Sequence, residues 1–128
     1  MKILHIEDDE GIRETVSLLF RVVMPEAALL SAGTGTDGVD AARYHQPDLV
    51  LLDLGLPDIS GFEVIVKIRE TSQVPIIVMT AMREPGTETK CFKLGANDFV
   101  QKPFHHKTLV ECINRVICGD TVSEDMTV

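Results

Sequence analysis

Acidic residues, a threonine and a lysine stand where apolar runs of this 128-residue chain give way to polar sequence. They are Glu7 and Asp8 after the first run, Asp53 after the third, Thr80 at the end of the fourth, and Lys102 after the last. Two carboxylates about 4 Å apart repel each other by roughly 4 kcal/mol at an effective dielectric of 20. A single lysine cannot offset three carboxylates, whereas Mg²⁺ binds through carboxylates, water and phosphate oxygens. The pattern predicts phosphoryl chemistry beside a bound Mg²⁺ ion.

Charge and reach assign a role to each of these side chains. Asp53 is the candidate nucleophile, because a carboxylate can accept a phosphoryl group as an aspartyl phosphate. Glu7 and Asp8 are expected to hold the metal. Lys102 is expected to pair with the Asp53 carboxylate and then with a phosphoryl oxygen, and Thr80 to donate a hydrogen bond to another phosphoryl oxygen.

Main-chain groups complete the predicted site, and purely structural roles compete with it. The backbone of Gly55 and Ala81 is expected to contribute, since Gly55 has no side chain to obstruct the metal. A lone acidic run such as residues 7–10 more often charges the N-terminus of a helix, where its dipole favours negative groups. Asp53 resists that interpretation, because a charge that ends a buried strand is costly without partners.

The elements that must position these residues follow from hydrophobic periodicity. Nearly continuous apolar runs, typical of parallel strands covered on both faces, predict strands at 3–6, 49–52 and 75–79. Two weaker patterns indicate further strands at 28–31 and 98–100. Helical patterns fall between them, at 12–23, 37–45, from Gly61 onward with Phe62, Ile65 and Val66, at 87–94 and at 109–117. The prediction is an α/β, flavodoxin-like, doubly wound fold: a five-stranded parallel sheet of strand order 2-1-3-4-5 with five helices. Ligands of such sheets sit beyond the carboxyl ends of the strands, where these polar residues fall.

Length and composition restrict the alternatives. With 45% hydrophobic and 25% charged residues, the chain fits one domain over 1–118, and 119–128 is expected to be a disordered tail or the start of a linker. A net charge of −8 argues against nucleic-acid binding by this chain alone. No run is long enough for a membrane span, and the short N-terminal apolar run is no signal peptide. Three cysteines without C-x-x-C spacing fit reduced thiols in the cytoplasm.

Four segments, in order and at their spacing, resemble the receiver domain of two-component response regulators over about residues 2–118. The matching segments are ILHIEDD at 3–9, LLDLGLPDISG at 51–61, VPIIVMTA at 74–81 and LGANDFVQKPF at 94–104. The resemblance implies that Asp53 takes a phosphoryl group from the phosphohistidine of a sensor histidine kinase or phosphotransfer protein. It implies Mg²⁺ ligation by Asp8, Asp53 and the carbonyl of Gly55, with Glu7 acting through water.

The resemblance also implies a conformational switch made of Thr80 and an aromatic residue, here Phe99. Phe99 lacks the hydroxyl of the commoner tyrosine. Phosphorylation is expected to reshape the face formed by the helix at 87–94, the strand at 98–100 and the last helix. That face would bind a downstream protein or a fused output domain. The domain would be no turnover enzyme, although it would catalyse its own phosphorylation and dephosphorylation.

Other functions remain as alternatives. An aspartyl-phosphate phosphatase would need a second aspartate where Gly55 stands, and an FMN-binding module would need more aromatic residues than this chain has. A detached receiver of a DNA-binding regulator is a closer alternative. Its usual dimer is doubtful because Asn97 replaces a common aspartate and Cys112 stands where a pairing arginine is frequent, so a monomer or a phosphorylation-dependent homodimer is expected.

Two features are predicted to be structural. His5 lies inside a buried strand and is expected to be a core histidine with satisfied hydrogen bonds. Gly33, Gly35 and Gly38 could suggest a phosphate loop, but they lack the P-loop lysine spacing and are interpreted as turns.

Overall fold

Strands and helices alternate along the chain in the computed structural model, which describes residues 1–119. The strands are β1 (Lys2–Ile6), β2 (Ala28–Ala32), β3 (Leu49–Leu52), β4 (Ile76–Thr80) and β5 (Asp98–Gln101). The helices are α1 (Glu10–Val23), α2 (Gly35–His45), α3 (Gly61–Arg69), α4 (Thr87–Leu94) and α5 (His106–Ile117). The predicted strands are therefore confirmed to within one residue at each end, and each predicted helix is present. The tail expected at 119–128 lies, apart from Gly119, outside the described residues.

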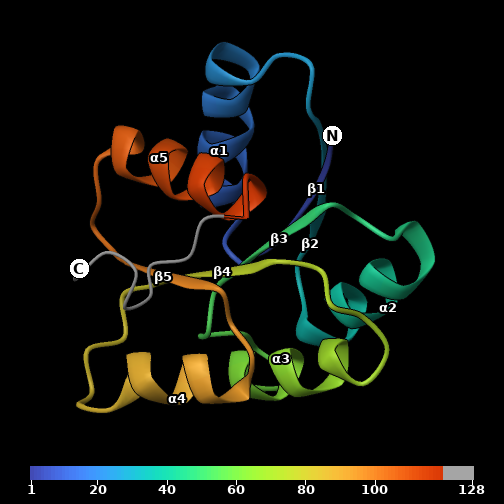
Figure 1. Cartoon of the computed structure of the whole chain (residues 1–128), viewed down its shortest axis with the longest axis vertical. Helices are drawn as coiled ribbons and strands as arrows, with labels where there is room; N and C mark the ends of the chain where they lie inside the picture. The colour runs from blue at the N-terminus through green and yellow to red at the C-terminus, as the bar shows by residue number, and fades with distance from the viewer. Residues whose placement is uncertain (120–128) are drawn as a thin grey trace.

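The five strands form one parallel sheet in the order β2-β1-β3-β4-β5. Helices α1 and α5 cover one face, and α2, α3 and α4 cover the other, so the sheet is the middle of three layers (Figure 1). The predicted flavodoxin-like topology is confirmed. All five strands end at the same edge, which places the residues after β1, β3, β4 and β5 side by side.

Each face of the sheet packs on its own apolar core. Alternate residues of β1 divide between the two: Ile3 packs with Val16 and Phe20 of α1, and Leu4 and Ile6 pack toward α2 and α3. The central strands β3 and β4 are buried along their whole length, which explains why they are continuously apolar in sequence. Among residues 1–119, none of the helices has the length and the apolar character needed to cross a bilayer.

Polar side chains fix where several helices begin. Asp9 caps α1 by accepting from the N–H of Ile12, Thr34 caps α2, and Ser60 caps α3. Because Thr34 is the cap, α2 begins two residues earlier than the predicted 37–45.

The prediction that Gly35 and Gly38 form turns is wrong, since both lie within α2. A Cβ at Gly38 would lie 2.5 Å from Cδ1 of Ile6. This glycine therefore lets α2 approach the sheet closely.

Candidate functional site

Strand register brings three carboxylates together at the carboxyl edge of the sheet. The N–H of Glu7 donates to the carbonyl of Ala32 (2.9 Å), and the N–H of Asp53 donates to the carbonyl of Ile6 (3.0 Å). The sheet ladder thus continues past the strand ends and holds both residues. One carboxylate oxygen from each of Glu7, Asp8 and Asp53 lies within 4.8 Å of the others.

This set of donors fits a hard divalent cation. All three groups offer oxygen, and they range from buried (Glu7) through half-buried (Asp53) to exposed (Asp8). A site of this kind binds Mg²⁺ while leaving positions for water and phosphate oxygens. Gly55 faces the same space, because a Cβ there would lie 3.7 Å from Oδ2 of Asp53.

Lys102 reaches into the cluster from the segment after β5, but its main partner differs from the predicted one. Its Nζ donates to Oε1 of Glu7 at 2.9 Å and lies 3.9 Å from Oδ1 of Asp53. The predicted pair with Asp53 is thus present as the longer of two contacts, and the sequence did not indicate the closer contact with Glu7. Glu7 is the more buried carboxylate, 1% exposed, so it has the greater need of a counter-charge.

Glu7 is the most constrained of the three acids. Its Oε2 accepts from the N–H of Asp9 (3.2 Å), and its carbonyl accepts from Nη1 of Arg13 (2.6 Å). Burial raises the pKa of the Glu7 carboxyl, and the hydrogen bond from Lys102 opposes that rise. Arg13 thus fixes the backbone of Glu7, and Lys102 fixes its carboxylate.

The loop after β3 is shaped by close packing at Gly61. The carbonyl of Leu54 accepts from the N–H groups of Leu56 (3.1 Å) and Gly61 (3.0 Å). A Cβ on Gly61 would lie 2.5 Å from Cα of Leu54, so only glycine allows this approach. The loop therefore returns tightly to α3 and holds Asp53 and Gly55 at its near end.

Asp58 ties this loop to α2. Its carboxylate accepts from the N–H groups of Gly35 (2.8 Å) and Thr36 (2.9 Å) at the first turn of the helix. The side chain of Thr36, together with these backbone N–H groups, holds the pKa of the Asp58 carboxyl well below its usual range. Sequence reasoning missed this contact, which joins residues 22 or more positions apart.

Thr80 and Ala81 lie on the other side of Asp53, at the end of β4. Thr80 is 2% exposed, and its hydroxyl oxygen accepts from the N–H of Met82 (3.1 Å). Gln101 of β5 reaches the same segment through its side-chain amide, which donates to the carbonyls of Thr80 (3.0 Å) and Met82 (3.1 Å). Sequence reasoning also missed Gln101, because a polar residue at a strand end gives no sign of its partner.

Phe99 is half-buried on β5 and packs against the core on the α2, α3 and α4 side of the sheet. It pairs in register with Val78, two residues before Thr80. With Met82 and Gln101 it lines a shallow pocket beside the loop after β4. The predicted switch residues Thr80 and Phe99 therefore lie on adjacent strands, two positions apart in the register.

His5 is buried as predicted, but its expected hydrogen-bond partners are missing. The residue is 0% exposed, and within residues 1–119 neither ring nitrogen has a hydrogen-bond partner. Burial, with the nearby charges of Lys102 and Arg13, lowers the pKa of His5 to about 4. The ring is thus neutral and sits under the acidic cluster without contributing a bond to it.

Asn97 and Cys112, the two positions that depart from the usual dimer pattern, form hydrogen bonds within the chain. Asp98 is buried on β5 and accepts from Nη2 of Arg115 (2.8 Å) and Sγ of Cys112 (2.9 Å), both on α5. Asn97 accepts from Nη2 of Arg69 and from the N–H of Ile76. The charge on Asp98 is therefore paired within the protomer by an arginine one turn beyond Cys112.

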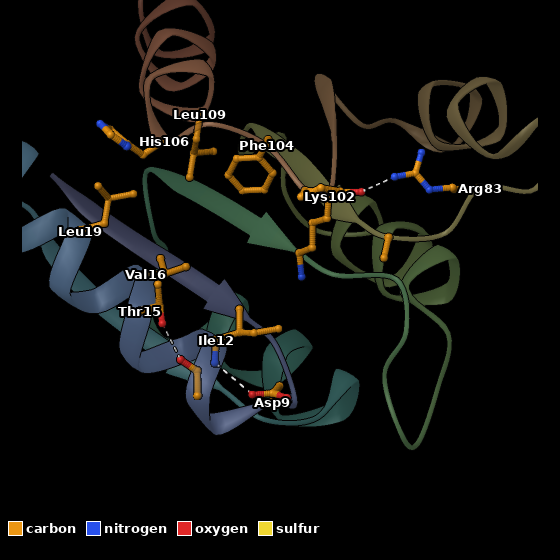
Figure 2. Close-up of a pocket in the computed structure, with 13 residues that line it drawn as sticks. Asp9, Ile12, Thr15, Val16, Leu19, Arg83, Lys102, Phe104, His106 and Leu109 are labelled. Atoms are coloured by element: carbon orange, nitrogen blue, oxygen red, sulfur yellow. Dashed lines mark hydrogen bonds between the residues drawn. The ribbon is translucent and has the colours of Figure 1, made fainter.

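A cavity of about 880 Å³ opens beside Lys102, between α1 and the start of α5. Its walls are largely apolar: Ile12, Val16 and Leu19 project from α1 toward Phe104 and Leu109 on the opposite side (Figure 2). Asp9, Ala81 and Lys102 also line it. The acidic cluster and this apolar groove are therefore adjacent.

Comparison with known sequences identifies a family whose profile matches most of the chain. A family profile described as the response regulator receiver domain matches residues 3–114. The "Cell cycle transcriptional regulator CtrA" of Caulobacter vibrioides is 34% identical over 118 residues, which cover 91% of this chain and 50% of the relative. The "Cell cycle response regulator CtrA" of Brucella ovis is 30% identical over the same length. The chain thus spans about half the length of these curated relatives.

Solved structures agree on the fold. A two-component response regulator of the LuxR family from Aurantimonas sp. superposes with a TM-score of 0.86 at 26% identity, covering 94% of this chain and 86% of the other. A CheY-like response regulator receiver domain protein from Methanospirillum hungatei gives a TM-score of 0.84 at 22% identity, covering 92% and 94%. The second likeness concerns the fold alone.

Proposed function

Because the chain belongs to the response regulator receiver domain family, we propose that it is a phosphorylation-dependent switch that takes a phosphoryl group onto Asp53. The observation that carries the proposal is the meeting of Asp53 with Glu7, Asp8 and Lys102 at one edge of the sheet. The donor would be the phosphohistidine of a sensor histidine kinase or of a phosphotransfer protein. We place this chemistry in the cytoplasm, where the three free cysteines stay reduced.

The transfer is a displacement at phosphorus. A carboxylate oxygen of Asp53 forms a bond to phosphorus while the P–N bond of the donor breaks, and the electron pair of that bond goes to the imidazole nitrogen. Asp53 enters as a carboxylate, so it has no proton to lose. In a separate second displacement, a water oxygen forms a bond to phosphorus while the P–O bond to Asp53 breaks. The electron pair of that bond returns to the Asp53 carboxylate, a proton of the water passes to the phosphate or to solvent, and inorganic phosphate leaves, which gives the domain its own dephosphorylation.

Asp8, Asp53 and the carbonyl of Gly55 would hold Mg²⁺, and Glu7 would act through a metal-bound water. When bound, Mg²⁺ neutralises the charge that gathers on the phosphoryl oxygens. The short contact between Glu7 and Lys102 supports an indirect role for Glu7, because one of its oxygens is already occupied.

Three donors of the chain would bind the phosphoryl oxygens. Lys102 would move from its shared position between Glu7 and Asp53 onto one oxygen. The hydroxyl of Thr80 and the N–H of Ala81 would bind the others. A phosphoryl group adds about −1.5 to −2 charge and three acceptor oxygens, so it attracts all three donors.

The switch would follow from the movement of Thr80. As its hydroxyl turns toward the phosphoryl group, Phe99 would turn inward into the space beside it. The face formed by α4, β5 and α5 would then change its shape for a downstream protein. Because the chain spans half the length of its curated relatives, that target could equally be a fused output domain, and the switch could act as a monomer or as a phosphorylation-dependent homodimer.

The groove between α1 and α5 supports a protein donor. A phosphohistidine that approaches Asp53 must bring its own protein surface over the adjacent residues, and the groove there is apolar and open. We propose that an apolar surface of the donor packs on Ile12, Leu19 and Phe104. The lysine at the edge of this groove is the one that would meet the incoming phosphoryl group.

The test is intact mass after incubation with Mg²⁺ and acetyl phosphate, a small phosphodonor. We expect a single phosphate adduct in the wild type, none in Asp53→Asn, and a normal adduct in Asp40→Asn, which changes an exposed aspartate of α2. An adduct of equal yield in Asp53→Asn would overturn the assignment. Sustained turnover of small phosphate esters would instead favour a phosphatase, although Gly55 stands where such enzymes need a second aspartate.

A further inference from the structure

The side chain of Gln101 braces the segment that follows β4. Its Nε2 donates to the carbonyl of Thr80 (3.0 Å) and to the carbonyl of Met82 (3.1 Å), so both hydrogens of one amide hold the carbonyls on either side of Ala81. Gln101 is half-buried. It is therefore a fixed contact on the loop rather than a solvated surface group.

The carbonyl of Thr80 is held from one side only. Besides Gln101, it accepts from the N–H of Lys102 (2.8 Å), and both donors belong to β5 or to the residue directly after it. The strand order is β3-β4-β5. The Thr80 carbonyl therefore points toward β5 and away from β3.

The direction of the Thr80 carbonyl fixes the direction of the Ala81 N–H, because both belong to the same peptide group. The peptide between Thr80 and Ala81 is trans, so its C=O and N–H point in opposite directions in one plane. With the carbonyl held toward β5, the N–H of Ala81 points toward the side of β3, where Asp53 lies. Within residues 1–119 this N–H donates to no backbone or side-chain acceptor, so it is available to a ligand.

We propose that Gln101 is a positioning residue whose amide fixes the peptide before Ala81, and thereby aims the Ala81 N–H at the phosphoryl group on Asp53. The inference rests on the proposed function and adds a residue that does not touch the phosphoryl group. Gln101 also connects the phosphoryl site to the proposed switch, because its amide binds the carbonyl of Thr80, the switch residue at the end of β4.

A second hydrogen bond ties the same loop to the residue that follows β5. Nη2 of Arg83 donates to the carbonyl of Lys102 (2.9 Å), which Figure 2 shows as a dashed line. The loop then continues to Gly86, and α4 begins without a side-chain cap. Gln101 is the contact nearest to Ala81, and Arg83 is more exposed and farther along the loop.

The test compares Gln101→Met with the wild type and with Gln73→Met. Methionine keeps the length of the side chain but has no N–H to donate, and Gln73 is an exposed residue that receives the same chemical change. We measure the limiting rate and the half-saturating concentration of acetyl phosphate by intact mass, and the Mg²⁺ affinity by calorimetry. Because Gln101 aims a phosphoryl-binding donor, we expect the limiting rate of Gln101→Met to fall about 10- to 100-fold.

The Mg²⁺ affinity of Gln101→Met should stay unchanged, since its side chain contacts none of the proposed metal ligands. A general loosening of the fold would lower the Mg²⁺ affinity as well as the rate. A limiting rate equal to that of the wild type would overturn the role of Gln101 and leave the proposed function intact. If the wild type and Gln73→Met also gain no adduct at Asp53, both proposals fail.

The wild-type protein supplies a second measurement that does not depend on the folding of a variant. In ¹⁵N-edited spectra, the side-chain amide protons of Gln101 should exchange with water more slowly than those of Gln73. The Ala81 N–H resonance should shift on addition of beryllofluoride and Mg²⁺. If the side-chain amide protons of Gln101 and Gln73 exchange at equal rates, or if the Ala81 resonance does not shift, the positioning role of Gln101 is wrong.

Discussion

His5 is a polar residue that the protein keeps in its core without compensation. Its ring lies on the α1 and α5 side of β1, where Ile3 also packs, and neither nitrogen forms a hydrogen bond within the described chain. A buried polar group without a partner costs about 1–3 kcal/mol. The sequence predicted burial correctly, because the residue stands in an apolar run, but no pattern in the sequence tells whether a partner will be present.

Replacing His5 by leucine should stabilise the protein. Because the ring is neutral and unpaired at pH 7, His5→Leu should raise the free energy of unfolding by about 1 kcal/mol. The measurement is urea unfolding at pH 7 in the absence of divalent ions. His106→Leu is the control on an exposed position of α5, where a change within about 0.5 kcal/mol is expected. A loss of stability in His5→Leu would mean that the ring has a partner in solution, such as an ordered water.

At the scale of elements, the site depends on contacts between loops and helices that the chain separates widely. Asp58 joins the loop after β3 to the first turn of α2, and Arg13 of α1 holds the carbonyl of Glu7. Negative charge at the N-terminus of a helix is favoured by the helix dipole and by its free N–H groups. The loop that carries Asp53 is thus fixed at its far end by a helix on one face of the sheet.

Removing the charge of Asp58 should weaken this tie. Asp58→Asn keeps one acceptor oxygen but places an NH₂ group against a backbone N–H, so the midpoint of urea unfolding at pH 7 should fall. The folded carboxyl has a lowered pKa, so its contribution is fully present above the ordinary value of 3.8 and is lost as the pH falls below it. The stability difference between wild type and Asp58→Asn should therefore shrink between pH 7 and pH 3.

Asp37→Asn is the matched control for that comparison. Asp37 lies in the same first turn of α2 and carries the same charge, but its carboxylate receives no hydrogen bond within the described residues. If both variants lose equal stability, the effect belongs to charge near the helix end and not to the tie made by Asp58.

Strand positions could be predicted because burial on both faces imposes continuous apolar runs, as at residues 49–52 and 76–79. The topology then placed Asp53 and Lys102 at one edge. What the sequence could not supply was the choice among nearby partners: Lys102 prefers Glu7, which is the more buried acid, and Asp98 pairs with Arg115. Those choices depend on burial and side-chain reach, which exist only once the elements have packed.

For the whole molecule, the decisive feature is an excess of negative charge that is concentrated at one edge. The chain carries a net charge of −8, and three of its carboxylates meet within 4.8 Å with one close lysine. Repulsion in this cluster opposes folding when no cation is bound. The three carboxylates at the carboxyl edge therefore lower the stability of the cation-free fold, and together they form a site that a divalent cation can occupy.

This balance predicts opposite effects of one substitution with and without Mg²⁺. Asp8 is the exposed member of the cluster, so Asp8→Asn should fold well, and without divalent ions it should be more stable than the wild type because one repulsion is removed. With Mg²⁺ at about ten times its dissociation constant, the wild type should gain about 1.4 kcal/mol of unfolding free energy, and Asp8→Asn should gain far less.

Asp40→Asn removes an exposed charge on α2 and should keep the full gain. The measurement is urea unfolding with EDTA or with MgCl₂, at an ionic strength matched with NaCl so that general screening is equal. An equal gain in Asp8→Asn would remove Asp8 from the metal site, and an equal stability without Mg²⁺ would show that the carboxylates do not repel each other enough to matter.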